Sequence, residues 1–424
     1  MRSFRFFLCF QFIFIIAAAQ QPRTLRIDPD FATGMPVSQV FEEVNFIPLE
    51  TTRESLFGTI NQLGISDQYF IILDRSTNAI LIFQKDGKYH TKISMKGLNV
   101  YSFEYEKDHD RIRVYSTNDK DLGRQLRERA ESDVADAVRL MRRFFKVEYF
   151  DLNGKSLKIP ATKKSLTLEN LSSITLPGDY MFSNFAIADE GMKEESFELK
   201  LYKNGELYQS YFPYTHNKES ARYGLYLRNP SGFSVSQFDT VLYFTRPLDY
   251  SIYELSPHSF NERFQIVFPM KNTFPQTFIT DKMTGNDRRN FLRDNPALIT
   301  GISNIHERGN RLFFKINNSA QRRSGTTSIL YDLKTDQVIS INKMSPDSSS
   351  YFLPVFDFAF SNESFKVADA NYLYSYTSSL RMFQAIEENA TKGITYPLSL
   401  DQYIKTGNKK DNPVIVQLKP ILNH

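Results

Sequence analysis

The chain has 424 residues, of which 41% are hydrophobic and 24% are charged, and its formal net charge is +4. These values are typical of globular proteins, and the near balance of charge argues against general nucleic-acid binding. Phe (37 residues) and Tyr (23 residues) are abundant while Trp is absent, and because Phe and Tyr suit half-buried pleated surfaces, the composition favours a β-rich fold.

The first 19 residues have the pattern of an export signal. Arg2 and Arg5 precede the apolar stretch FFLCFQFIFIIAAA, which ends in small residues suited to cleavage. We therefore predict a signal peptide over residues 1–19 and a mature chain that begins at residue 20 or 21. The alternative is a membrane anchor, but the stretch is shorter than the roughly 20 residues that a spanning helix needs.

The only cysteine, Cys9, lies inside this apolar stretch. A lipoprotein would need its cysteine at the cleavage point, so we expect no lipid anchor. Removal of the signal would also leave no cysteine for disulfides. No second apolar run is long enough to span a membrane. The sequence thus predicts an exported protein, periplasmic or extracellular, without a membrane span.

After a lead-in over residues 20–43, a strand-rich unit recurs in altered form. Its clearest copy is YFIILDRSTNAILIFQKDGKYHTKI, residues 69–93. Comparable units return at roughly 50–80 residue intervals, which is propeller-blade spacing extended by insertions. The predicted strands of the six units, in chain order, are INQLGI, YFIILD, AILIFQ and KYHTKI; YSFEYE, RIRVYS, FFKVEYF and KSLKIP; MFSNFAIA, SFELKLY and LYQSYF; GFSVSQ, TVLYFT, YSIYEL and RFQIVF; GISNIH, RLFFKIN, SILYDL and VISINK; and VFDFAF, SFKVAD and PVIVQLKP.

Five of these units share an aromatic residue at the end of the third strand, followed by a turn such as KDGK or KNGE. These aromatics are Phe83, Phe150, Tyr202, Tyr253 and Tyr331. Asp-Gly and Asn-Gly supply the positive φ that tight hairpins need. An ordinary β-sandwich with hairpins is the alternative. In a propeller, the unpaired strand VNFIPLE (residues 44–50) would become the outermost strand of the last blade and close the ring.

Several segments resemble a six-bladed, NHL-like β-propeller family of uncharacterised Bacteroidota envelope proteins. They are FIPLETTRESLFGTI (residues 46–60), YQSYFPY (208–214), DTVLYFTRPLDYSIYEL (239–255) and DNPVIVQLKP (411–420). The resemblance implies an all-β, six-bladed propeller over residues 44–424. It brings no agreed catalytic residues. Many members of that family are lipoproteins, and this chain departs from them by lacking a cysteine at the cleavage site.

Strand counting predicts that long connections gather on one face of the ring. The turns between strands one and two, and between three and four, are short. Long segments fall between strands two and three or between blades, at residues 117–143, 161–179, 215–231, 271–300, 317–327 and 343–354. Long loops on a rigid scaffold are where binding concentrates.

The largest of these insertions reads as a helix in blade two. Leu122, Leu126, Ala130, Val134 and Val138 recur at helical spacing and continue to residue 141. Such a stripe usually packs on its own protein, and a lid or docking helix is the functional alternative. Shorter helices are predicted at residues 287–294 and 379–389.

Arginines gather in the predicted long loops, and we take them as candidate ligand-binding residues. They are Arg75, Arg222, Arg228, Arg246, Arg322 and Arg323, with Asp249 and Tyr250 beside them. Arginine forks recognise carboxylates and phosphates, so converging arginines would indicate an acidic ligand. Solvated surface charge is the alternative.

The sequence has no local catalytic motif. Its six histidines are scattered singly, so no zinc site is expected, and no G-x-S-x-G elbow, P-loop or EF-hand is present. We predict a non-enzymatic binding or scaffold protein without a cofactor, acting on an unknown ligand or envelope protein partner. The alternatives are a propeller-type enzyme (lactonase, lyase or glycan-processing hydrolase) at the central channel, where calcium could bind, and a structural subunit of a surface complex.

Overall fold

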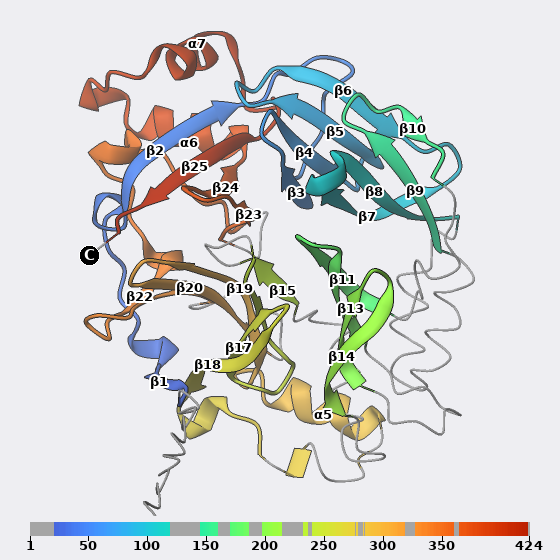
Figure 1. Cartoon of the computed structure of the whole chain (residues 1–424). Helices are drawn as coiled ribbons and strands as arrows, with labels where there is room; N and C mark the ends of the chain where they lie inside the picture. The colour runs from blue at the N-terminus through green and yellow to red at the C-terminus, as the bar shows by residue number, and fades with distance from the viewer. Residues whose placement is uncertain are drawn as a thin grey trace, which may run out of the picture.

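The computed structural model describes residues 21–118, 145–159, 170–185, 197–213, 232–235, 240–275, 277–278, 283, 285–318, 327–359 and 364–422. Six small sheets, built almost wholly of antiparallel strands, surround a central axis (Figure 1). The chain is a six-bladed β-propeller, and the predicted fold class is confirmed.

Each blade is a sheet whose strands follow one another outward from the axis. Blade one contains β3 (Gln62–Ile65), β4 (Tyr69–Asp74), β5 (Ala79–Gln84) and β6 (Tyr89–Ser94). Blade two contains β7 (Asn99–Glu106), β8 (Arg111–Thr117), β9 (Phe145–Asp151) and β10 (Ser156–Leu157). Blade three contains β11 (Asn170–Leu176), β12 (Tyr180–Phe185), β13 (Phe197–Lys203) and β14 (Glu206–Pro213). Blade four contains β15 (Phe233–Val235), β16 (Leu242–Phe244), β17 (Ser251–Ser256), β18 (Ser259–Val267) and β1 (Arg23–Arg26). Blade five contains β19 (Ile299–Arg308), β20 (Arg311–Asn318), β21 (Ser328–Asp332) and β22 (Val338–Ser340). Blade six contains β23 (Val367–Ala368), β24 (Leu373–Thr377), β25 (Val414–Pro420) and β2 (Phe41–Pro48).

All five predicted aromatics lie in the third strand of their blade, as the repeat indicated. In three blades the aromatic marks a β-bulge against the fourth strand, because the register shifts at Phe83, Tyr202 and Tyr253. A bulge adds local twist and turns the outer strand away from a flat edge. In these three blades the aromatic thus lies where the pairing with the outer strand shifts.

Two blades differ from the prediction. The first strand of blade three, β11, lies in the segment predicted to be a link over residues 161–179, because NLSSITL carries few apolar residues. In blade six, the described part of VFDFAF (residues 355–359) is irregular, and LYSYT forms the missed strand β24. The alternation in VFDFAF reflects ring packing instead, since Phe356 packs on Phe358 and on Phe365.

The two ends of the chain close the ring as predicted. Strand β2 pairs antiparallel with β25, with Phe46 opposite Val416, and so becomes the outermost strand of blade six. The β5–β6 turn of blade one abuts this closing strand. Gly87 in that turn has φ +90°, and a Cβ atom there would lie 2.1 Å from the carbonyl oxygen of Pro48.

Substitution of Gly87 by alanine is therefore expected to lower the free energy of unfolding by about 2 kcal/mol or more, because the left-handed φ and the backbone clash add. Gly97→Ala is the matched control: Gly97 has φ +72° with no atom within 4 Å, so only the φ strain applies. Urea unfolding of both variants measures the difference. Equal losses would show that the contact with Pro48 is unimportant.

The N-terminal segment runs along the outer edge of three blades before it closes the ring. Strand β1 adds in parallel to β18 of blade four, and Thr33 then bridges to Ile339 of blade five. Arg311 of β20 donates to the carbonyl oxygens of Val40 at 2.6 Å and Gln39 at 2.9 Å. We call residues 23–40 the N-terminal strap. Part of the predicted lead-in thus lies in the propeller's sheets and cores.

The element bounds place the long connections on one face of the ring, which we call the long-loop face, and the predicted asymmetry is confirmed there. The opposite end, the short-turn face, carries turns such as residues 309–310 and 204–205. The helices of the described residues are α5 (Gly285–Asp294), α6 (Ser379–Glu388) and α7 (Leu398–Thr406), with the short 3-10 helices η1 (Pro29–Phe31), η2 (Val37–Gln39), η3 (Lys107–His109), η4 (Met270–Asn272), η5 (Ile341–Lys343), η6 (Ser348–Ser350) and η7 (Ala390–Lys392).

Helices α5 and α6 confirm the two predicted short helices, whereas α7 was missed. The predicted signal peptide and the predicted blade-two helix (residues 122–141) lie outside the described residues. Within the described part of the chain, no helix is long and apolar enough to cross a membrane.

Candidate functional site

Of the predicted binding residues, Arg246, Asp249 and Tyr250 come together in the β16–β17 connection of blade four, on the long-loop face. Arg75 lies in blade one, across the ring, where its guanidinium donates to the carbonyl oxygen of Tyr101 at 3.0 Å. The other four predicted arginines, Arg222, Arg228, Arg322 and Arg323, lie outside the described residues.

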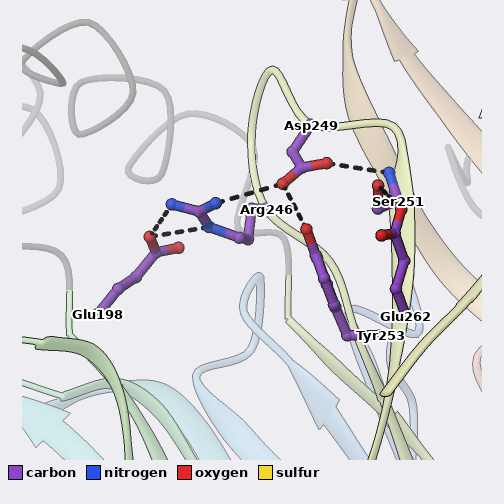
Figure 2. Close-up of polar contacts among 6 residues, drawn as sticks. All are labelled: Glu198, Arg246, Asp249, Ser251, Tyr253 and Glu262. Carbon is purple, nitrogen blue, oxygen red and sulfur yellow. Dashed lines mark hydrogen bonds and ion pairs between the residues drawn. The ribbon is translucent and has the colours of Figure 1, made fainter. Parts of the chain in front are cut away.

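Arg246 is held between two carboxylates from neighbouring blades. Its Nε and Nη2 atoms donate to Glu198 of blade three at 2.9 and 2.7 Å, and Nη1 donates to Asp249 at 3.3 Å (Figure 2). The Glu198 side chain is 0% exposed and that of Arg246 is 10% exposed. A buried ion pair of this kind fixes geometry, so the charge of Arg246 is already matched within the protein.

Asp249 continues the network into blade four, as Figure 2 shows. It accepts hydrogen bonds from the Tyr253 hydroxyl at 3.0 Å and from the Ser251 backbone N–H at 3.0 Å. The Ser251 hydroxyl donates to Glu262 at 2.6 Å. Burial raises the pKa of Tyr253, which therefore acts as a hydroxyl donor at neutral pH.

Tyr250 points elsewhere and packs the base of the loop. Its hydroxyl donates to the carbonyl oxygen of Ile299 at 2.8 Å and accepts from the Phe274 N–H at 3.4 Å. Burial raises the pKa of Tyr250 to about 12. These contacts join blade four to blade five and to the segment that leads to α5.

Backbone strain surrounds Arg246. Phe212 has φ +56° and Leu248 has φ +57°, in the left-handed region that bulky residues avoid at a cost of about 1–2 kcal/mol each. The Phe212 ring centroid lies 4.1 Å from the Arg246 guanidinium carbon. Leu248 packs with Phe278 and Leu292. Strain of this kind persists where surrounding structure imposes it, often at functional sites.

A second strained place lies in the blade-five to blade-six link on the same face. Tyr351 (φ +55°) and Phe352 (φ +56°) are consecutive left-handed aromatics. The Phe352 N–H donates to the Asp347 carbonyl oxygen at 2.8 Å, and the Lys392 ammonium lies 3.7 Å from the Phe352 ring centroid. The Tyr351 ring lies 6.0 Å from that of Tyr396.

All other non-glycine residues with positive φ in the described chain are Asn or Asp, which tolerate that conformation: Asn78, Asp110, Asp179, Asn204, Asn304 and Asp336. Strain in bulky residues is therefore confined, among the described residues, to the long-loop face. The sequence did not predict the left-handed conformation of Phe212, Leu248, Tyr351 and Phe352, because no residue pattern indicates a positive φ at bulky residues.

The described contact between blades two and three is charged, whereas each of the other contacts between neighbouring blades includes an apolar cluster. Apolar clusters join blade one to six, one to two, three to four, four to five and five to six. On the face of blade two turned from blade one, Arg113 donates to Glu104 at 3.1 Å and Glu106 pairs with Arg111 and Arg113. The Glu104 carboxylate accepts from the Thr175 N–H of β11 in blade three.

This contact predicts a pH-dependent stability. Burial raises the pKa of Glu104 from 4.5 to about 7, against the attraction of Arg113. The folded protein then binds more protons than the unfolded chain between these values, so the Glu104 contribution to stability falls as pH rises from about 4.5 to about 7. We expect Glu104→Gln to flatten this dependence in urea unfolding measured across that range. An unchanged slope would contradict the assignment.

In the described chain no group of three or more His, Cys, Asp or Glu side chains could hold a metal ion. The Arg246 network consists of side chains that bond one another. The one hydroxyl–carboxylate contact among these described side chains besides that of Tyr253 is Ser251 with Glu262, at 2.6 Å.

Comparison with known proteins gives the fold and little more. A family profile described as a 6-bladed beta-propeller matches residues 24–119. A crystal structure of a putative exported protein from Bacteroides fragilis is 15% identical, covers 95% of this chain and 100% of its own, and has a TM-score of 0.58. A Bacteroides vulgatus protein (10% identity; 89% and 96% covered) and a streptogramin B lyase (11% identity; 70% and 75% covered) have TM-scores of 0.41 and 0.31.

No curated protein matches the chain. At 15% identity, the likeness to the Bacteroides fragilis protein speaks for architecture alone. The chain is a six-bladed β-propeller that is similar in fold to that protein.

Proposed function

We propose that this propeller is an exported, non-enzymatic binding or scaffold protein that recognises a ligand or protein partner through its long-loop face. The observation that carries the proposal is the confinement of bulky left-handed residues to that face, at Phe212 and Leu248 beside Arg246 and at Tyr351 and Phe352 beside Lys392. Such strain costs stability, and it is typical of sites where recognition requires a fixed geometry.

Two further features support the proposal. The Arg246 ion pair joins the long-loop ends of blades three and four, which holds the loops in fixed positions for binding. The signal-peptide pattern of residues 1–19 supports export, and the Bacteroides fragilis protein of the same fold is described as exported. The proposed location is therefore the periplasm or the exterior of the cell.

A thermal-shift screen of residues 20–424 against calcium, acidic sugars, oligosaccharides and peptides tests the proposal, because a ligand of the folded state raises Tm by mass action. Tyr351→Asn on the long-loop face relieves strain and removes a partly exposed ring. Tyr208→Asn is the matched control at the short-turn end, where Tyr208 is 52% exposed. A shift lost in Tyr351→Asn and kept in Tyr208→Asn is expected. The reverse pattern, or no shift with any compound, would contradict ligand recognition at this face.

The same screen also distinguishes a binding protein from the enzyme alternative. A compound that raises Tm is incubated with the protein and analysed for conversion. A binding protein returns the compound unchanged, whereas turnover would replace the proposal by a propeller-type enzyme.

A further inference from the structure

Two buried side chains with unsatisfied polar atoms, His306 and Arg308, lie toward the short-turn end of β19, the inner strand of blade five. His306 is 6% exposed, and its ring packs edge-on against Phe365 of blade six with centroids 5.7 Å apart. Neither ring nitrogen has a hydrogen-bond partner in the structure as described. Buried polar atoms are nearly always bonded, so such an exception needs a physical reason.

Arg308, two residues further along β19, is 3% exposed and only partly satisfied. Its Nη1 and Nη2 atoms each donate to a backbone carbonyl oxygen, of Glu307 and Asp369 respectively, at 2.7 Å, and Nε has no described partner. No carboxylate of the described residues lies within ion-pair distance of Arg308.

The two nearest acids are bonded elsewhere. Glu307 accepts from Arg263 at 2.7 and 3.0 Å and from the Tyr243 hydroxyl. The Asp369 carboxylate accepts from the Tyr374 hydroxyl at 2.6 Å and from backbone N–H groups of its own turn. A buried guanidinium without a carboxylate costs free energy, and an anion that bonds to it would remove that cost.

Residues two apart on a regular strand point to the same side, and β19 is regular from His306, opposite Phe313, to Arg308, opposite Arg311. We propose that His306 and Arg308 form a binding site for a small oxyanion, a carboxylate or a phosphate, at the seam of blades five and six. Arg308 Nε and one imidazole N–H are the donors that the anion would satisfy.

The site predicts a linkage between anion and proton. Burial and the nearby Arg308 charge lower the pKa of His306 to about 3, so the imidazole is neutral when no anion is bound. A bound anion favours the imidazolium and raises its pKa, so binding takes up protons. For an anion whose own charge does not change, affinity is therefore higher at low pH, and that pH dependence belongs to His306.

Isothermal titration of the full mature chain with acetate and with inorganic phosphate, at pH 5.5 and pH 8 and constant ionic strength in chloride, tests the proposal. We expect saturable binding of at least one anion and, for acetate, which is mostly ionised at both pH values, tighter binding at pH 5.5. Comparison of the two anions at one pH separates carboxylate from phosphate preference. Arg308→Gln is expected to weaken binding at least 10-fold. No saturable binding at either pH would overturn the proposal.

His306→Phe provides a second variant that keeps a ring against Phe365 and removes both nitrogens. We expect it to raise Tm in anion-free buffer, because buried unsatisfied nitrogens are lost, and to abolish the pH dependence of any remaining anion binding. A lower Tm together with unchanged, pH-dependent binding would show that His306 takes no part. This variant also keeps the test decisive if Arg308→Gln does not fold.

Discussion

Replacement of Arg246 by methionine is expected to lower the free energy of unfolding by about 3–5 kcal/mol. The substitution leaves the carboxylate of Glu198, which is 0% exposed, without the guanidinium that donates to it twice. Breaking a buried pair from one side is costly because the remaining charge stays buried and loses both hydrogen bonds that Arg246 donates. Denaturant unfolding of the variant and the parent chain measures the loss.

The double variant Arg246→Met with Glu198→Gln separates charge from packing. Removing both charges leaves no buried carboxylate that has lost the Arg246 guanidinium, so the double variant is expected to recover most of the lost stability. Equal losses in the single and double variants would show that the Arg246 stem and its stacking on Phe212 carry the effect instead. The Arg246 network would then be a packing feature rather than an electrostatic one.

A chain that begins at Phe41, without the N-terminal strap, is expected to lose about 5 kcal/mol or more of stability. The strap buries Leu25, Ile27, Val37 and Val40, all at most 1% exposed, in the cores between blades four and five and between five and six. Full burial of each such side chain contributes about 1.5–3 kcal/mol. The truncation also exposes the edge of β18, which β1 covers.

Thermal unfolding and solubility of the truncated and full mature chains measure this effect. Arg311→Met is the milder companion, since it removes only the hydrogen bonds that fix the end of the strap at Val40 and Gln39. A truncated chain with the parent Tm would contradict the role of the strap. It would also show that β2 alone suffices to close the ring.

The sequence was enough to predict the blades where apolar strands alternate with clear turns. YFIILD and AILIFQ match β4 and β5 residue for residue, because their side chains are buried on both faces and their turns contain Gly or Asn. Strand β11 was missed because NLSSITL is mostly polar, and β24 because LYSYT follows a short irregular stretch. A local hydrophobic pattern indicates which residues are buried more reliably than it indicates which segments pair as strands.

The candidate site was predictable only in part. Sequence position placed Arg246 and Asp249 in a long-loop-face connection, but the partner Glu198 lies 48 residues away in another blade. The left-handed aromatics Phe212 and Tyr351 depend on tertiary contacts that no local signal encodes. The contact of Glu104 with blade three likewise depends on how neighbouring blades pack against each other. Prediction of single strands does not give that packing.

Hydrogen–deuterium exchange of the mature chain, with and without a compound or peptide that raises Tm, tests recognition through the long-loop face most directly. We predict protection at residues 245–250 and 348–352, with little change at the short turns over residues 153–154 and 204–205, which lie in blades two and three, away from His306 and Arg308. Protection confined to the short turns would contradict that claim and move the binding surface to the opposite face of the ring.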